Sequence, residues 1–378
     1  MWAPVATPRI LLPPGAAGSI SRRFCALQNQ APRKLSNGYA GFMSWLASRN
    51  DDGDLSAVRI GTSQESGRGL FASRPVRAGE RVLEISLDLM IAPSDLPGEL
   101  STVLSSTVKP WTKLALIVLM ERYKGQSSAW APYISCLPEP AELDNTFLWE
   151  DTELSYLRAS PLYGKTRERL EMITTEFGQV QNALDVWPQL FGKVSLEDFK
   201  HVYATVFSRS LAIGEDSTLV MQIPMLDFFN HNATSFAKLS FNGLLNYAVV
   251  TADRDYAEND QIWINYGDLS NAELALDYGF AVPENPYDET DLLTQFPEMN
   301  TILKDQLGGN TLGQKPLHGS PVCLEVARRI ETHEKSILEL NQHSWRSRSR
   351  QLLAAAVLAG ELRALKSVKH RLDGTRQA

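Results

Sequence analysis

Short apolar runs, some of them alternating with polar residues, recur in two parts of this chain, and Gly or Pro follows most of them. This pattern predicts β-strands at residues 58–60, 81–85, 219–223 and 262–266. Gly67, Gly69 and Gly79 lie between the first two of these strands. That spacing is typical of a β-meander with tight corners.

Apolar residues with helical spacing occupy most of the region from about 94 to 211. Residues 111–123 are largely apolar on all sides, as expected for a buried helix. Ser270 and Glu273 fit a capping box at the start of a short helix, and Gly279 fits the residue that follows its end. The other predicted helices span residues 38–50, 154–162, 166–178, 196–211, 322–342 and 351–372.

The order of these elements predicts the fold class. Strands flank a long helical insertion and a helical tail follows, which matches neither βαβ alternation nor a β-sandwich. We therefore expect an α+β protein with its main body at residues 38–283, a helical insertion at about 94–211, and a helical domain at 284–378. The acidic, Pro-containing residues 284–297 are predicted to form a linker.

Charge is distributed unevenly along the chain. Residues 1–37 contain five basic residues and no acid, so the net charge of −7 becomes −12 when that segment is set aside. Such an acidic body is poorly suited to neutralising phosphates, and we expect no nucleic-acid partner. The most apolar run, residues 114–120, is too short to cross a membrane, so none is expected as a partner. The three scattered cysteines fit neither a disulfide framework nor a zinc cluster.

The leading segment, residues 1–37, has the composition of an organelle transit peptide. It is basic and rich in Ala, Pro and Ser, and its apolar run is too short and too interrupted by Pro for a secretory signal. A disordered tail is the alternative. Composition alone does not separate plastid from mitochondrion; the Pro content and weak amphipathicity favour the plastid.

Two stretches carry the residues of greatest chemical interest. Residues 224–231 place Asp227, Asn230 and His231 within five positions, among Leu and Phe. Polar groups enclosed in this way must find hydrogen-bond partners or they destabilise the fold. Residues 262–267 form the second stretch, an apolar strand that ends at Tyr266. We expect the two stretches to meet in space.

Single motifs in this chain are weak signals. Residues 67–72 superficially match a dinucleotide-binding fingerprint, but that motif opens a helix, whereas Pro75 and Gly79 follow here. The chain has no Gly-x-Ser-x-Gly elbow, Walker loop, His-Glu-x-x-His or paired Cys-x-x-Cys. His231 has no second histidine nearby, so no metal site is expected. Taken singly, Asn230-His231 and Tyr266 would more often be structural than functional.

The order of the motifs is more specific than any one of them. Along the chain come the Gly-rich residues 67–72, Phe-Ser-Arg-Ser at 207–210, Asp227 with Asn230-His231, Tyr266-Gly267, and residues 270–280 beginning Ser-Asn-Ala-Glu-Leu. This arrangement resembles the SET-domain protein-lysine N-methyltransferases, in the branch typified by the plant Rubisco large-subunit methyltransferases. Residues 58–280 carry the resemblance, and the helical tail matches that branch's substrate-binding domain more loosely. The resemblance implies small twisted sheets with a pseudoknot-like crossing.

The same resemblance implies roles for individual residues. Tyr266 matches the catalytic tyrosine. A glycine in the corner before residue 68 is physically sensible, because a Cβ would hold the backbone away from a ligand. Contacts to S-adenosylmethionine are implied for Ser66, Gly67, Arg68, Arg209, Asn230 and His231. Contacts to the substrate side chain are implied for Arg209, Asp227, Tyr266 and Tyr278.

These matches imply transfer of a methyl group from S-adenosylmethionine to a lysine of a non-histone protein, such as the Rubisco large subunit or another stromal protein. The enzyme is expected in the chloroplast stroma, as a monomer. Residues 210–213 lack the bulkier and charged substrate contacts that this family has after the arginine. A SET-like scaffold that docks proteins with little catalysis is therefore one alternative. Methylation of a protein histidine is another.

Overall fold

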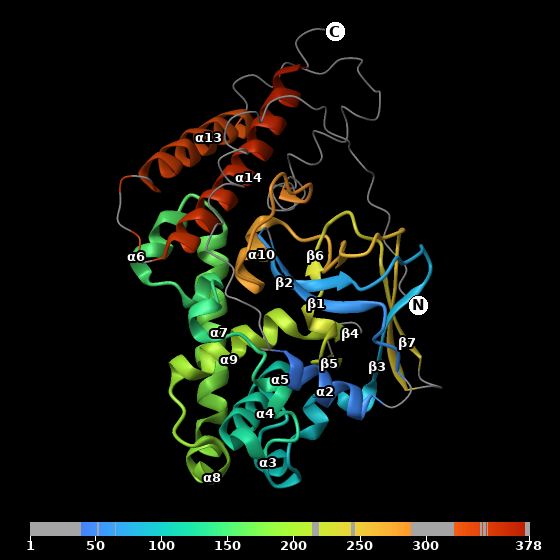
Figure 1. Cartoon of the computed structure of the whole chain (residues 1–378). Helices are drawn as coiled ribbons and strands as arrows, with labels where there is room; N and C mark the ends of the chain where they lie inside the picture. Colours follow the sequence, from blue (N-terminus) through green and yellow to red (C-terminus); the bar gives the residue numbers. More distant parts are fainter. Residues whose placement is uncertain are drawn as a thin grey trace.

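Figure 1 shows the computed structural model of the chain, which describes residues 39–50, 53–64, 66–213, 219–242, 246–288, 321–340, 342, 345 and 347–374. The predicted transit peptide at 1–37 and residues 289–297 of the predicted linker lie outside the described residues. Among the described helices, none is both long and apolar enough to cross a membrane.

A four-stranded sheet joins the two stretches of interest. Its order is β1 (Val58–Ser63), β2 (Gly67–Ala72), β9 (Gln261–Ile264) and β6 (Asn230–His231). β1 and β2 form an antiparallel hairpin, and β9 pairs antiparallel with β2. β6 pairs parallel with β9. Parallel neighbours need a long crossover connection. The chain between β6 and β9 makes this connection and contributes strands to the second sheet.

That second sheet and one further hairpin complete the β part of the protein. β8 (Tyr247–Thr251) lies between β3 (Arg81–Ser86) and β7 (Lys238–Asn242), antiparallel to both. β4 (Leu211–Ile213) and β5 (Leu219–Met221) form the hairpin. Strands are thus confirmed at all four predicted positions, although those expected at 219–223 and 262–266 end earlier, at Met221 and Ile264, and Gln222 makes an isolated bridge to Ile91.

The predicted insertion is helical and packs beside the sheets (Figure 1). α4 (Pro110–Lys124) lies at its centre, with residues 114–118 fully buried, and it packs against α9 (Leu196–Arg209). A separate helix, α2 (Ala40–Arg49), precedes the first strand and buries Phe42 and Leu46. The helices of the insertion are α3 (Gly98–Val103), α4 (Pro110–Lys124), α5 (Ala131–Ile134), α6 (Asp151–Leu154), α7 (Leu162–Val186), α8 (Pro188–Phe191) and α9 (Leu196–Arg209).

The helix predicted at 154–162 is wrong. The chain instead ends α6 at Leu154, makes a 3₁₀ turn over Ser155–Leu157, and begins α7 only at Leu162. Pro161 restricts the residue before it away from helical backbone angles. The hydroxyl of Ser160 then accepts a hydrogen bond from the Leu162 N–H at 3.0 Å, so one helix stops and another starts at this point.

Two long helices, α13 (Pro321–Leu340) and α14 (Arg348–Gly374), form the C-terminal part and lie side by side (Figure 1). The second half of α14 packs on α13 in a small apolar cluster that includes Val326, Leu365 and Val368. The first half of α14, through Leu353 and Val357, belongs to the main core instead. The C-terminal helices are therefore anchored directly on the body of the protein.

The start of the predicted linker is packed against the main body. Asn285 and Asp288 are each 6% exposed. Asp288 accepts hydrogen bonds from the backbone N–H of Asn271 at 2.8 Å and from its side-chain amide at 3.1 Å. Asn271 is the first residue of α10 (Asn271–Asp277), whose predicted capping box between Ser270 and Glu273 is confirmed. The linker expectation is thus corrected for these residues, because their polar side chains satisfy the free amides of a helix start.

Replacing Gly279 by Ala is expected to destabilise the protein by about 2–4 kcal/mol. Gly279 has a φ of +75°, and an added Cβ would lie 2.8 Å from backbone atoms of Asp144 and Asn145. The matched control is Gly178→Ala in α7, where φ is helical and nothing lies within 4 Å of the new Cβ. That variant is expected to gain about 0.5–1 kcal/mol. Urea unfolding measures the stability of both variants, and equal changes in the free energy of unfolding would contradict the steric role given to Gly279.

Candidate active site

The parallel pair of β6 and β9 brings the two predicted stretches together. Asn230 lies opposite Trp263 and His231 opposite Ile264. Just beyond β9, Tyr266 bonds back to the first stretch twice: its hydroxyl donates to the Phe229 carbonyl at 2.6 Å and its backbone N–H donates to His231 Nδ1 at 3.1 Å. The expectation that these stretches meet in space is confirmed.

The hydrogen bond to His231 fixes the state of its imidazole ring. Because Nδ1 accepts from the Tyr266 N–H, the proton of the neutral ring is on Nε2. The side chain is buried, and burial lowers the pKa of His231 to about 4. Within the described part of the chain, buried Nε2 has no hydrogen-bond partner. His231 therefore presents a neutral N–H donor that has no hydrogen-bond partner among the described residues.

Asn230 uses its side chain to hold the Gly-rich corner. Its amide donates to the carbonyls of Ser66 at 3.2 Å and of Arg68 at 2.8 Å. Between them, Gly67 has a φ of +66°, and an added Cβ there would meet nothing within 4 Å. The corner therefore combines a fixed backbone with open space beside it. Its glycine is required by backbone conformation.

A buried charge cluster lies next to the Asn-His pair. The Asp227 side chain is 1% exposed, and Arg209 Nη1 lies 3.6 Å from its Oδ2 while donating to its backbone carbonyl at 3.1 Å. Burial raises the pKa of Asp227, and the nearby Arg209 and Arg68 oppose that rise. Neither carboxylate oxygen of Asp227, nor Arg209 Nε, has a hydrogen-bond partner among the described residues. These groups are held in place with hydrogen-bonding capacity to spare.

The Arg68 side chain points into the protein. Its guanidinium lies 3.9 Å from the ring centroid of Phe228 and donates to the Cys136 carbonyl at 2.6 Å and to the Tyr39 hydroxyl at 3.3 Å. These contacts tie β2 to the loop after α5 and to α2. Any contact of residue 68 with a ligand in the corner would therefore be made by its backbone.

Aromatic rings form one wall of the site. The ring of Tyr266 lies 4.9 Å from that of Tyr278 and 5.2 Å from that of His231, and Phe280 lies 6.1 Å from Tyr278. Burial raises the pKa of Tyr266 to about 12 and raises the pKa of Tyr278 still further. Both phenols are therefore protonated near neutral pH, and Tyr266 acts as a donor rather than as a base.

Tyr133 lies beside the buried charge cluster and was not predicted as a site residue. Tyr133 is fully buried on α5, and its pKa is raised by burial and by the neighbouring charge of Asp227. The signal was present in the aromatic, Pro-containing run at 130–138. Nothing in its spacing, however, indicated that it folds back onto residue 227, more than ninety positions away.

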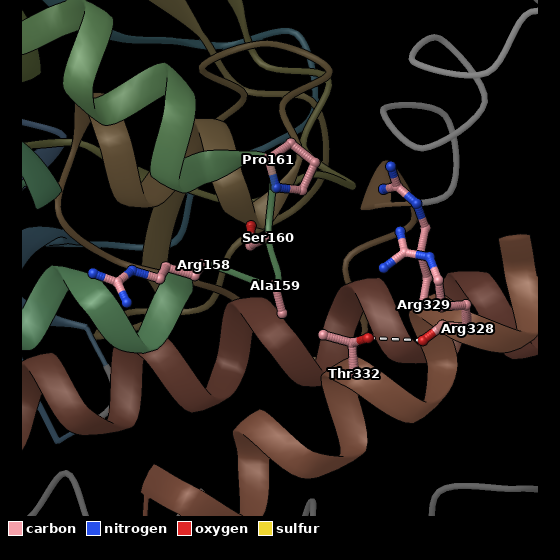
Figure 2. Close-up of a pocket in the computed structure, with 7 residues that line it drawn as sticks. All are labelled: Arg158, Ala159, Ser160, Pro161, Arg328, Arg329 and Thr332. Carbon is pink, nitrogen blue, oxygen red and sulfur yellow. Dashed lines mark hydrogen bonds between the residues drawn. The ribbon is translucent and has the colours of Figure 1, made fainter.

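The structure also contains a cleft of about 320 Å³ that none of the predicted site residues line (Figure 2). It lies between residues 158–161, which connect α6 to α7, and helix α13. Its lining consists of Arg158, Ala159, Ser160, Pro161, Arg328, Arg329 and Thr332.

The fold and the site together define a SET-domain protein. Residues 67–267, more than half of the chain, match the SET domain family, and the chain belongs to that family. It is 31% identical over 303 residues to the chloroplastic fructose-bisphosphate aldolase-lysine N-methyltransferase of Arabidopsis thaliana, covering 76% of this chain and 60% of that protein. It is 29% identical over 279 residues to the chloroplastic ribulose-1,5 bisphosphate carboxylase/oxygenase large subunit N-methyltransferase of Nicotiana tabacum, covering 70% of this chain and 56% of that protein. The chain thus spans less than two thirds of the length of either relative.

A solved structure agrees with this assignment. The SET domain of LSMT, bound to lysine and AdoHcy, superposes with a TM-score of 0.66 at 22% identity, over 90% of this chain and 92% of that one. At that identity the likeness shows the fold. The predicted α+β SET-domain fold, with an insertion and C-terminal helices, is confirmed.

The neutral state of His231 predicts a pH dependence of stability. Its folded pKa of about 4 lies below the unfolded value of 6.5, so the unfolded chain takes up a proton in that window while the folded protein does not. The free energy of unfolding should therefore fall as pH is lowered from about 6.5 to about 4. Urea titrations at several pH values measure the free energy of unfolding of the wild type and of His231→Gln. The difference between the two should shrink as pH falls from about 6.5 to about 4. A constant difference would contradict the prediction.

Proposed function

We propose that this chain transfers a methyl group from S-adenosylmethionine to a lysine side chain of a non-histone protein in the plastid. The observation that supports this most strongly is the fixed phenol of Tyr266. It lies beside a free imidazole donor of His231 and near a buried Asp227–Arg209 pair that has hydrogen-bonding capacity left. These groups can position a polar ligand by hydrogen bonds, and none of the described residues of the site is an activated nucleophile.

The residues present fit S-adenosylmethionine. The corner at Ser66–Arg68 leaves space beside Gly67 where backbone groups could approach a ligand. Arg209, with its unpartnered buried Nε, could pair with the methionyl carboxylate. The His231 Nε2–H could donate to the cofactor, whereas Asn230 would contact it through its backbone, since its side chain holds the corner. When bound, the cofactor supplies a methyl group activated by a sulfonium charge.

The chain's own residues would then position the accepting amine. Tyr266 is fixed by its bond to the Phe229 carbonyl and can align the amine with the methyl group, and alignment of this kind supplies much of the acceleration in a direct transfer. Burial and the nearby cations Arg209 and Arg68 disfavour a protonated amine, which must be neutral to react. The rings of Tyr266 and Tyr278 suit the methylated cation that results.

Relatives support the choice of a plastid protein as the substrate. Two chains similar to this one are named as chloroplastic methyltransferases of aldolase lysine and of the Rubisco large subunit. The basic, acid-free segment at 1–37 agrees with import. We propose a stromal protein, such as the Rubisco large subunit, as the substrate and a monomer as the acting form. We also propose 38–283 as the SET domain and 284–378 as a helical substrate-binding domain.

Replacing Tyr266 by Phe should lower methyl transfer by about a hundredfold or more, because the amine loses its alignment. The loss of a hydrogen bond to a buried carbonyl should also cost about 1–3 kcal/mol of stability. The full chain is incubated with labelled S-adenosylmethionine and a plastid soluble extract, and labelled residues are mapped by mass spectrometry. Tyr123→Phe, which alters an exposed tyrosine on α4, is the matched control and should behave as the wild type.

Other outcomes of the same assay would overturn the proposal. Label on a histidine that disappears with Tyr266→Phe would replace lysine by histidine as the target. If calorimetry shows the cofactor bound but no label is transferred, the SET-like scaffold becomes the better description. No saturable binding of S-adenosylmethionine would remove the methyltransferase proposal altogether.

A further inference from the structure

The cleft between the insertion and α13 is a built feature of the fold. One wall is the segment 158–161, and the other is the face of α13 that carries Arg328, Arg329 and Thr332 (Figure 2). Ser160 in the first wall is 4% exposed. The two walls come from parts of the chain that are far apart in sequence, so their meeting depends on contacts beneath them.

A buried polar network holds the two walls together. The Ser160 hydroxyl donates to Glu361 Oε1 at 2.6 Å, and Glu361 Oε2 lies 2.8 Å from His333 Nε2. His333 Nδ1 lies 2.8 Å from the Arg329 carbonyl, and a carbonyl can only accept, so that nitrogen carries a proton. The insertion, α13 and α14 are thus joined beneath the cleft. Its shape is set before anything binds, which lowers the entropic cost of binding.

The charge of the cleft is opposite to that of the chain. Three of its seven described lining residues are arginines and none is acidic, whereas the whole chain has a net charge of −7. Arg328 and Arg329 both bond to Glu325, and the Arg328 side chain is 63% exposed against 23% for Arg329. A ligand carboxylate could compete with Glu325 for Arg328, because an ion pair at so exposed a guanidinium is screened by solvent. Arg158 forms no ion pair with a described residue and has the ring of Tyr163 at 5.9 Å.

The directions of the arginines indicate the shape of the ligand. In Figure 2, Arg328 and Arg329 extend side by side at one end of the cleft, while Arg158 extends away from segment 158–161 at the other. Guanidinium groups that do not converge are poorly suited to a single small anion. They suit an extended ligand with carboxylates at several points along its length, each of which can form charge-assisted hydrogen bonds.

We propose that this cleft binds an acidic, Asp- or Glu-rich segment of the protein that the chain methylates, and so selects substrates remote from the methyl-transfer site. The inference rests on the proposed function for the identity of that partner. The observations that carry it are the preformed walls, the three arginines and a lining that shares no residue with the proposed methyl-transfer site.

Binding of a short fluorescent peptide that alternates Glu and Ser tests the proposal by anisotropy on the full chain. The cleft variant Arg158→Gln with Arg328→Gln should bind the peptide about tenfold more weakly or worse. The matched control is Lys335→Gln with Lys366→Gln, which removes equal charge from exposed positions of α13 and α14 outside the cleft lining. That control should stay within about twofold of the wild type, a change small on the scale of the cleft effect.

Once a substrate is identified, the cleft variant should raise KM by about tenfold and leave kcat unchanged, as expected when only uniform binding is lost. Three results would overturn the proposal: equal binding by the cleft variant, equal loss in the control, or equally tight binding of a single-stranded oligonucleotide of the same charge. Calorimetry with S-adenosylmethionine on the same preparations separates the two proposals. If the peptide binds through the arginines but the cofactor does not bind, the methyltransferase proposal is wrong. If methyl transfer occurs but the peptide does not bind, the docking proposal for the cleft is wrong.

Discussion

The parallel pairing of β6 with β9 is the constraint on which the site depends. Strand β6 consists of Asn230 and His231 alone. Its register against β9 determines where Tyr266, just beyond β9, lies relative to them. The hydrogen bonds from Tyr266 to Phe229 and His231 then close this arrangement from both its side chain and its backbone. A shift of one residue would turn every side chain of the strand to the other face, so the pairing also sets which groups the site presents.

The second constraint is the burial of charge beside that pairing. The Asp227 side chain is almost fully buried, and the positive charge of Arg209 alone would balance its negative charge. Arg68 adds a second cation nearby, although its own hydrogen bonds go to Cys136 and Tyr39. The cluster thus carries a net positive charge in a region of low dielectric, where interactions are strong. Such a region favours an anionic ligand group and a neutral amine, which are the two requirements of the proposed reaction.

Sequence patterns predicted the strands, the capping box and the meeting of the two stretches, because these depend on local alternation and on the need of buried polar residues for partners. They did not predict what each side chain does. The contact of Asn230 with a cofactor stays a prediction, and nothing in the sequence indicated that its side chain bonds to the carbonyls on both sides of Gly67. The helix expected at 154–162 was wrong because Ser160-Pro161 interrupts it. Contacts such as those of Tyr133 and Arg68 join distant segments and leave no periodic signal.

Helix α7 contacts segments of both the cleft and the proposed methyl-transfer site. It begins next to the cleft-lining segment 158–161 and carries Arg169, which bonds to Asp277 at 2.6 Å, one residue before Tyr278. The same guanidinium lies 4.4 Å from the ring centroid of Phe207, two residues before Arg209. One helix therefore contacts the cleft-lining segment, the aromatic wall and the end of α9. Under the proposed docking of an acidic segment, this helix would fix the distance between that segment and the residue delivered to Tyr266, so that reach along the substrate would add to charge as a criterion for selection.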